Sequence, residues 1–397
     1  MAALSKQTIR DLDVRGRQVL VRVDFNVPMK AGSIADDTRI RAAVPTIEAL
    51  RHAGARVVLM SHLGRPDGKV VDALRLAPIA AHLADLIGVP VAAVPDCIGS
   101  AARAAVKGLH DGDVCLLENV RFHAGEEANE PGFVAELAAL GDVFVNDAFG
   151  TAHRAHASTE GVGHLLPAVA GLLMEREIGI MGTALADPAR PFVAVVGGKK
   201  VSDKIGVLRN LIGRADHILI GGAMANTFLQ AQGHAMGASY VEGSAVSTAA
   251  EILDAASQAG TRLELPSDLV IAPRLEVDAP AMIVGVDAIP ADQMALDIGP
   301  DSVSRYGAVL REAGTVIWNG PMGVFEVAPF AAGTTGIAHA VAECAGTTIV
   351  GGGDSVAALE ATGLADRITH VSTGGGASLE FLEGKVLPGV AVLRDRH

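Results

Sequence analysis

The sequence repeats one pattern along nearly its whole length: a short apolar run, a polar or glycine-rich turn, and an Ala- and Leu-rich segment with helical spacing. The runs are continuously apolar, which is typical of strands buried on both faces of a parallel sheet. Strands that alternate with helices predict doubly wound α/β sheets. The predicted strands are residues 19–23, 56–60, 114–117, 143–146, 192–196, 217–220, 268–272, 315–318, 347–350 and 368–371. The predicted helices include residues 39–53, 77–87, 131–140, 203–212, 248–259 and 334–344.

The length of the chain predicts two such domains, because 397 residues with 50% hydrophobic content exceed what one core usually holds. Residues 165–185 are predicted to form one long apolar helix, which residues 187–191 terminate. We therefore expect a helix and hinge at 171–190, between a domain of residues 1–170 and a second domain of residues 191–372. The predicted fold class is α/β, with two doubly wound parallel-sheet (Rossmann-like) domains joined by that helix and hinge.

Charge and cysteine content limit the partners and the compartment. A formal net charge of −13 argues against nucleic acid or an anionic membrane as partner, since both favour basic surfaces. Cys97, Cys115 and Cys344 are widely spaced, so they indicate neither a disulfide framework nor a metal site. The N-terminal residues lack the apolar core of a signal peptide, and no apolar run is long enough to span a bilayer. We expect a soluble, cytoplasmic protein that acts on small molecules.

In the first half of the chain, polar and basic residues follow the predicted strands. His62 and Arg65 follow the strand at 56–60, Arg121 the strand at 114–117, and Arg154 the strand at 143–146. Ligands of parallel sheets bind at the carboxyl ends of the strands, so these side chains are predicted to converge on a compact anion. Arg39 stands at a helix start, where a cation is unfavourable, and this conflict also indicates function. Any one of these arginines alone is equally typical of a solvated surface.

In the second half, glycines follow the predicted strands, most clearly in the run Gly351-Gly352-Gly353-Asp354-Ser355. Glycines let the backbone approach a phosphate chain, and the N–H groups of a following helix attract it. Asp354 would repel that phosphate unless a cation such as Mg²⁺ lay between them. Taken alone, the same residues are at least as well explained by an ordinary helix N-cap. Residues 197–204 (GGKKVSDK) place lysines at another helix start, although neither a Walker A nor a dinucleotide-binding spacing occurs.

Together these motifs resemble the 3-phosphoglycerate kinase family. The resemblance covers essentially the whole chain, and it rests on several motifs in a fixed order rather than on any single one. The motifs are residues 22–28 (RVDFNVP), 61–66 (SHLGRP), 118–122 (ENVRF), 150–156 (GTAHRAH), 318–326 (WNGPMGVFE) and 351–355 (GGGDS).

The resemblance implies a role for each matching residue. The first domain would bind 3-phosphoglycerate through Asp24, Asn26, Arg39, His62, Arg65, Arg121 and Arg154. The second would bind MgADP or MgATP through Lys204, Gly222, Glu326, Gly352, Gly353, Asp354 and Ser355. Within that second set, Asp354 would hold the Mg²⁺ and Glu326 would contact the ribose. Arg39 and Lys200 match the pair that stabilises the transferring phosphoryl group, and Gly374 and Gly375 match a second glycine-rich loop. Residues 373–397 would return to the first domain, and the chain would work as a monomer.

The resemblance also implies the reaction: reversible phosphoryl transfer from 1,3-bisphosphoglycerate to MgADP, giving 3-phosphoglycerate and MgATP, in glycolysis and gluconeogenesis. The carboxylate acceptor needs no general base, so catalysis reduces to positioning and charge neutralisation during hinge-bending closure. The chain departs from the family at Lys199, Ala223 and Ala295, and Lys199 either adds charge near the nucleotide or faces solvent. A nicotinamide-dependent dehydrogenase is disfavoured by the missing dinucleotide glycines, and a non-catalytic scaffold by the completeness of both residue sets.

Overall fold

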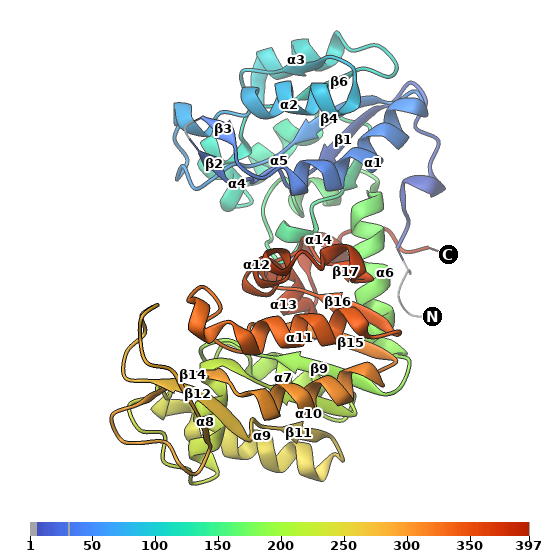
Figure 1. The fold of residues 1–397 in the computed structure, drawn as a ribbon. Helices are drawn as coiled ribbons and strands as arrows, with labels where there is room; N and C mark the ends of the chain where they lie inside the picture. Colours follow the sequence, from blue (N-terminus) through green and yellow to red (C-terminus); the bar gives the residue numbers. More distant parts are fainter. Residues whose placement is uncertain (1–5, 31, 397) are drawn as a thin grey trace. The chain divides into compact units, whose positions relative to one another are not determined.

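The computed structural model describes residues 6–30 and 32–396, and its chain trace is drawn in Figure 1. The described residues fall into two compact units, one from Met1–Gly182 with Val386–His397 and one from Thr183–Lys385. The sequence-based division grouped residues 373–385 with the returning C-terminal segment, whereas contacts group them with the second unit. Among the described residues, no helix is both long enough and apolar enough to cross a membrane.

The first unit is built on a sheet with strand order β5-β6-β4-β1-β7-β8. Its neighbouring strands pair in parallel, as where Val19 of β1 lies beside Val57 of β4 and Val143 of β7. The strands are β1 (Gln18–Arg22), β4 (Arg56–Met60), β5 (Val91–Ala93), β6 (Val114–Leu116), β7 (Val143–Asn146) and β8 (Ala168–Ala170), and a hairpin of β2 (Met29–Lys30) and β3 (Ser33–Ile34) follows β1.

Both faces of this sheet are buried. Ile47 and Leu83, from two helices, share one core with Val21 and Leu59 of the strands. Leu20 points to the opposite face of the sheet and is also fully buried. Burial on both faces explains why the strands are continuously apolar. The helices of this unit are α1 (Thr38–His52), α2 (Ala77–Ile87), α3 (Gly99–Lys107), α4 (Ala124–Glu127), α5 (Pro131–Ala138), most of α6 (Leu172–Ala186), and α14 (Pro388–Ala391).

The second unit has a parallel sheet with strand order β11-β10-β9-β15-β16-β17. Trp318 and Val195 of this sheet share a core with Tyr306 and Ile337 of two helices. The strands are β9 (Phe192–Val196), β10 (His217–Ile220), β11 (Arg262–Glu264), β15 (Thr315–Asn319), β16 (Thr347–Val350) and β17 (His370–Val371). The helices are α7 (Ile205–Leu211), α8 (Gly222–Ala231), α9 (Val246–Gln258), α10 (Pro300–Arg311), α11 (Ala332–Glu343), α12 (Gly353–Thr362) and α13 (Gly376–Leu382). Two parallel sheets flanked by helices confirm the predicted fold class.

One predicted strand belongs to a different kind of sheet. Residues 268–272 form β12 (Asp268–Ala272), but this strand pairs antiparallel with β13 (Met282–Gly285) and β14 (Met294–Ile298). The prediction of an all-parallel alternation is therefore wrong here. The segments that connect the three strands contain no helix, and a parallel crossover usually needs one.

The predicted long helix at residues 165–185 is also corrected. Its first part forms β8, which pairs in parallel with β7, and α6 begins only after Gly171. An apolar run cannot by itself be assigned to a strand or a helix, because both bury such residues. The neighbouring strand β7 decides the outcome by supplying hydrogen-bond partners to β8.

Side chains from distant parts of the first unit bind the first turn of α6. The amide of Leu172 donates to Thr46 Oγ1 at 2.9 Å. Asp147 Oδ1 accepts from the amides of Leu173 at 2.9 Å and Met174 at 3.2 Å. These bonds satisfy amides that have no partner inside the helix. Asp147 is fully buried, so it stabilises the start of α6 at the cost of desolvating its own carboxylate.

The C-terminal segment packs into the first unit through backbone contacts. Asn146, buried at the end of β7, donates from Nδ2 to the carbonyl of Gly389 at 2.9 Å. The amide of Gln7 donates to the carbonyl of Arg394 at 2.8 Å, and the Arg394 amide donates to Ala168 at 3.0 Å. The two ends of the described chain are therefore tied to the same sheet.

We predict that Asp147→Asn flattens the pH dependence of stability between about pH 4 and pH 7. Burial raises the pKa of Asp147 from 3.8 to about 7. In that window the folded protein holds a proton that the unfolded chain has released, so stability falls as the pH rises through the folded pKa. The amide side chain keeps an acceptor for the α6 amides but does not ionise.

Urea unfolding followed by far-UV circular dichroism across this pH range measures the effect, since the fluorescence of Trp318 reports only the second unit. Asp142→Asn is the matched control, because Asp142 is exposed and accepts one backbone bond from Gln18 at 2.9 Å. A constant difference in midpoint between the wild-type chain and Asp147→Asn at every pH would contradict the prediction.

Candidate functional site

The candidate residues of the first unit lie where its parallel strands end. In the sheet, β4, β5 and β6 lie on one side of β1 while β7 and β8 lie on the other, so the strand order reverses beside β1. The crevice at such a reversal is where open α/β sheets bind ligands. Asp24 and Asn26 follow β1, His62 and Arg65 follow β4, and Arg121 follows β6.

Arg39 is held against the loop after β1. It lies in the first turn of α1, and its Nη1 donates to Asp24 Oδ2 and to the carbonyl of Asn26, both at 3.1 Å. Asn26 Oδ1 in turn accepts from the amide of Gly64 at 2.9 Å. Arg39 thus has a fixed position although 36% of its side chain is exposed. The partial exposure leaves guanidinium N–H groups available to an anion.

His62 is buried and uncharged at neutral pH. Its Nδ1 lies 3.2 Å from Arg22 Nη2, and 4.0 Å from Asp24 Oδ1. Burial and the positive charges of Arg22 and Arg121 hold the pKa of His62 well below its usual range. His62 can therefore donate or accept a hydrogen bond at this site without adding charge.

Arg121 joins the loops that follow β4 and β6. Its Nη1 donates to the carbonyl of Gly64 at 2.8 Å, and its Nε pairs with Glu127 at 3.1 Å. Burial lowers the pKa of Arg121, and the positive charges of Arg154 and Arg65 lower it further. The structure therefore brings Arg65 and Arg154 close enough to Arg121 to repel it. An anionic ligand would relieve this repulsion.

Sequence reasoning left Arg22, Glu126 and His156 out of the site. Arg22 is 1% exposed and donates from Nε to Ser158 Oγ at 2.7 Å. Ser158 Oγ donates to the fully buried Glu126 at 2.6 Å. Burial, Arg121 and Arg154 lower the pKa of His156 to about 4. The available signal was Arg22 itself, a charged residue within an otherwise apolar strand.

In the second unit, glycine-rich loops lie at the corresponding reversal between β9 and β15. The amide of Gly222 donates to the carbonyl of Met322 at 2.8 Å, and the amide of Gly198 donates to the carbonyl of Pro321 at 3.1 Å. Gly222 has φ +69°, and a Cβ there would lie 2.5 Å from the Gly198 carbonyl oxygen. Only glycine permits so close an approach of these loops.

The loop after β16 presents Asp354 at the start of α12. Gly352 precedes the helix with φ +95°, and Asp354 lies exposed in the first turn. Ser355 is buried, and its hydroxyl accepts a hydrogen bond from the Gly320 amide. The N-cap reading of Asp354 finds no support, because no side chain caps α12.

Lys204 is close to the same loop. Its Nζ donates to Asn319 Oδ1, and Asn319 Nδ2 donates to the carbonyl of Gly351 at 2.8 Å. Burial lowers the pKa of Lys204, while the charges of Asp203 and Asp354 raise it. The structure therefore groups Lys204 with the loop after β16.

The remaining candidates of the second unit are less tightly placed. Lys200 and Glu326 are exposed, and neither makes a hydrogen bond or ion pair to the other candidates within the described ranges. Lys199 lies with its Nζ 4.9 Å from the Tyr240 ring centre, so it stacks on an aromatic side chain. The Gly374 amide donates to Ser372 Oγ at 3.1 Å, and Gly375 has φ +51°.

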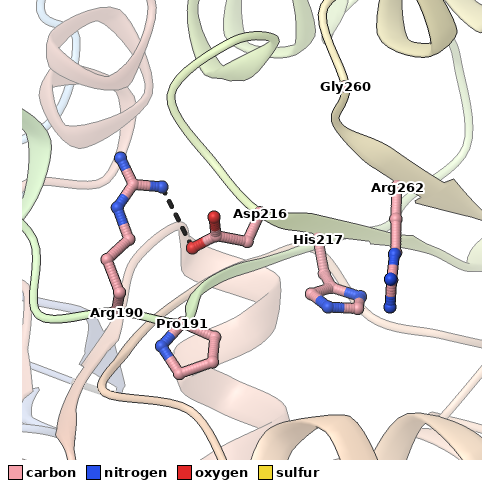
Figure 2. A pocket seen from close by; sticks show the side chains of 6 residues that line it. All are labelled: Arg190, Pro191, Asp216, His217, Gly260 and Arg262. Atoms are coloured by element: carbon pink, nitrogen blue, oxygen red, sulfur yellow. Dashed lines mark ion pairs between the residues drawn. The ribbon is translucent and has the colours of Figure 1, made fainter.

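A pocket of about 490 Å³ opens at the opposite edge of the second sheet and contains none of these candidates. Figure 2 shows its lining, where Arg190 pairs with Asp216 at 3.0 Å. His217 and Arg262 begin strands β10 and β11, so this pocket lies at the amino ends of the strands. The presence of a cavity therefore does not by itself identify the candidate site.

The residues present fit a magnesium ion at Asp354. Mg²⁺ binds one or two carboxylates together with phosphate oxygens and water. Asp354 offers an exposed carboxylate beside helix amides that attract phosphate. A carboxylate and a phosphate can share that position when a divalent cation lies between them.

Comparison with known proteins assigns the chain to a family. A model of the phosphoglycerate kinase family matches residues 9–385. Phosphoglycerate kinases of Moorella thermoacetica and Roseiflexus castenholzii are each 59% identical to this chain, over 99% of it and 100% of their own length. The structure resembles phosphoglycerate kinase from Coxiella burnetii with a TM-score of 0.90 at 42% identity, covering 98% of both chains. The enzyme from Pyrococcus horikoshii gives 0.85 at 34% identity, also over 98% of both. The chain belongs to the phosphoglycerate kinase family.

Proposed function

We propose that this chain catalyses the reaction of its family, the reversible transfer of a phosphoryl group from 1,3-bisphosphoglycerate to MgADP, giving 3-phosphoglycerate and MgATP in glycolysis and gluconeogenesis. The first unit binds 3-phosphoglycerate, and the second binds the nucleotide. The single observation that carries this proposal is the convergence of arginines at the carboxyl edge of the first sheet, in a chain of net charge −13.

The substrate carries a phosphate and a carboxylate, and the first unit supplies groups suited to both. Guanidinium groups bind either anion with paired hydrogen bonds. His62 remains neutral and supplies a hydrogen bond without adding to the repulsion among the arginines. Asp24 pairs with Arg39 at 3.1 Å and so holds that guanidinium in place. We assign 3-phosphoglycerate binding to Asp24, Asn26, Arg39, His62, Arg65, Arg121 and Arg154.

The nucleotide lies over the glycine-rich loops of the second unit. Its phosphates face backbone N–H groups at the start of α12, and Lys204 adds positive charge beside them. Bound Mg²⁺, held by Asp354, would neutralise phosphate charge and fix the orientation of the phosphate chain. Glu326 contacts the ribose. We assign nucleotide binding to Lys204, Gly222, Glu326, Gly352, Gly353, Asp354 and Ser355.

The transfer itself requires positioning and charge neutralisation. In the ATP-consuming direction the attacking carboxylate of 3-phosphoglycerate is already ionised, and in the opposite direction the attacking phosphate of ADP is, so no residue has to remove a proton. Arg39 and Lys200 stabilise the equatorial oxygens of the transferring group, and the amides of Gly374 and Gly375 approach the same group. Direct transfer brings the two bound substrates into contact, so we propose a hinge-bending closure that also excludes water from the acyl phosphate.

We further propose that the protein acts as a cytoplasmic monomer on small molecules, with neither nucleic acid nor membrane as partner. The net charge of −13 supports this, because polyanionic partners select basic surfaces.

A coupled assay of the purified chain tests the proposed reaction. ATP consumption is expected only when both 3-phosphoglycerate and Mg²⁺ are present. ATP consumption that is independent of 3-phosphoglycerate, or its absence with all components supplied, would contradict the proposal.

Arg39→Ala is expected to lower kcat by roughly 100- to 1,000-fold, the usual cost of removing one donor to a transition-state charge. The affinity for MgADP, measured by calorimetry, should change little, because Arg39 belongs to the first unit. Arg41→Ala is the matched control on the same helix, since Arg41 is 62% exposed and pairs with Asp37. A large loss of nucleotide affinity in Arg39→Ala would contradict the assignment of Arg39 to the 3-phosphoglycerate site.

Asp354→Asn is expected to weaken MgADP binding by about 10-fold or more. Mutating a residue that only supports a metal ligand already lowers metal affinity by about that factor, and Asp354 is proposed as a ligand itself. Binding of ADP without Mg²⁺ and of 3-phosphoglycerate should be nearly unchanged. Asp301→Asn is the control, since Asp301 is another exposed acid in the first turn of a helix of the same unit. If calorimetry showed that binding of MgADP and binding of 3-phosphoglycerate were weakened equally, the assignment of Asp354 to magnesium would be ruled out.

A further inference from the structure

The structure brings a cysteine, a histidine and an aspartate of the first unit together outside the proposed substrate-binding set. Asp96 and Cys97 lie in the loop between β5 and α3, and His123 lies between Phe122 and the start of α4. One ligand atom from each residue falls within 4.8 Å of the others. Within residues 6–30 and 32–396, no other group of three such side chains is this compact.

The three side chains have fixed positions. His123 Nε2 lies 2.7 Å from Asp96 Oδ1, and the Cys97 amide donates to the same oxygen at 2.7 Å. The imidazole also packs on Phe133, with ring centres 5.3 Å apart. Val94, just before the loop, donates its amide to Leu116 at 2.9 Å and anchors the loop to the sheet. Such preorganisation lowers the conformational cost of binding an ion.

The local charge favours a cation. The Cys97 sulfur lies in the negative potential of three acidic side chains, Asp96, Glu126 and Glu118. Cys97 is fully buried, whereas 46% of Asp96 and 32% of His123 are exposed. An ion can therefore approach from the side of Asp96 and His123, replace their mutual hydrogen bond, and reach the sulfur behind them.

We propose that Asp96, Cys97 and His123 form a binding site for a thiophilic divalent cation of the Zn²⁺ type. Sulfur, imidazole nitrogen and carboxylate oxygen are the three ligand types that Zn²⁺ takes, and three protein ligands leave a fourth position open to water. Mg²⁺ prefers oxygen ligands only, so this site differs in chemistry from the one proposed at Asp354. On binding, the Cys97 thiol loses its proton to the solvent as the sulfur–metal bond forms.

The spacing of the cysteines alone had indicated no metal site, and the fold explains the difference. His123 is separated from Asp96 and Cys97 by α3 and β6, and it reaches them only because β5 and β6 are neighbours in the sheet. A pattern of this kind is not visible as a short sequence motif.

Metal binding by the chelator-treated full-length chain tests the proposal. Zn²⁺ is titrated against a chromophoric chelator in the presence of excess Mg²⁺, which occupies oxygen-only sites. One Zn²⁺ should bind per chain, and Co²⁺ should give a thiolate-to-cobalt charge-transfer absorption. Cys97→Ala should abolish that absorption. His123→Gln should lower Zn²⁺ affinity more than about 10-fold, because losing even a residue that only supports a metal ligand lowers metal affinity by about that factor.

Two variants serve as controls with circular dichroism as a check of folding. Cys344→Ala removes a partly exposed thiol elsewhere, and His110→Gln breaks an exposed histidine–aspartate pair with Asp113 that lacks a cysteine. Both should bind Zn²⁺ as the wild-type chain does. Because His123 is partly exposed, His123→Gln tests the site even if Cys97→Ala fails to fold. Unchanged affinity in folded His123→Gln, or a wild-type chain that binds no Zn²⁺, would overturn the proposal.

Discussion

In β9 and β15 every residue is buried, so a charged side chain within these strands would lose its hydration without a partner to replace it. The same holds for most of β1, β4 and β7. Most of the polar chemistry therefore lies in the loops where the strands end, and Arg22, the last residue of β1, is buried only together with its partners. Because parallel strands all end at one edge, residues far apart in sequence meet there. Both candidate sites follow from this single constraint, although they use different residues.

The first unit shows what it costs to gather positive charge at such an edge. Burial and neighbouring cations lower the pKa of Arg22 and of Arg121, so each guanidinium is less stable charged than it would be in water. Carboxylates offset part of this cost: Asp24 contacts Arg39, and Glu127 contacts Arg121. The remaining repulsion disfavours the free protein and favours the complex with a small, multiply charged anion. Sites that bind strongly often carry such a local cost to stability.

The second unit avoids most of that cost by using its backbone. Amide groups at a helix start attract phosphate without carrying a full charge, so they do not repel one another as guanidinium groups do. The close packing of the loops around Gly222 and Met322 fixes where those amides point. A magnesium nucleotide brings its own counter-ion, which is consistent with a site that contains Asp354 beside few cations.

Much of the fold could be predicted, because continuous apolar runs and the turns between them are local features. The runs at 56–60 and 192–196 are strands with the predicted bounds. The run at 268–272 has the same apolar pattern, yet it pairs antiparallel with its neighbouring strand. The run at 168–170 was predicted to be helical from its sequence, but it forms a strand because it pairs with β7. Strand partners lie far away in sequence, so local patterns do not specify them.

Residue types and their positions along the chain already indicate most of the groups in the two candidate sites, because arginines follow one set of predicted strands and glycines follow another. The state of those groups depends on the folded structure. It makes His62 neutral, turns Lys199 onto Tyr240, draws Arg22 into the buried network, and places His123 beside Cys97. Protonation and pairing depend on burial and on distances between residues remote in sequence, and those distances exist only after the chain has folded.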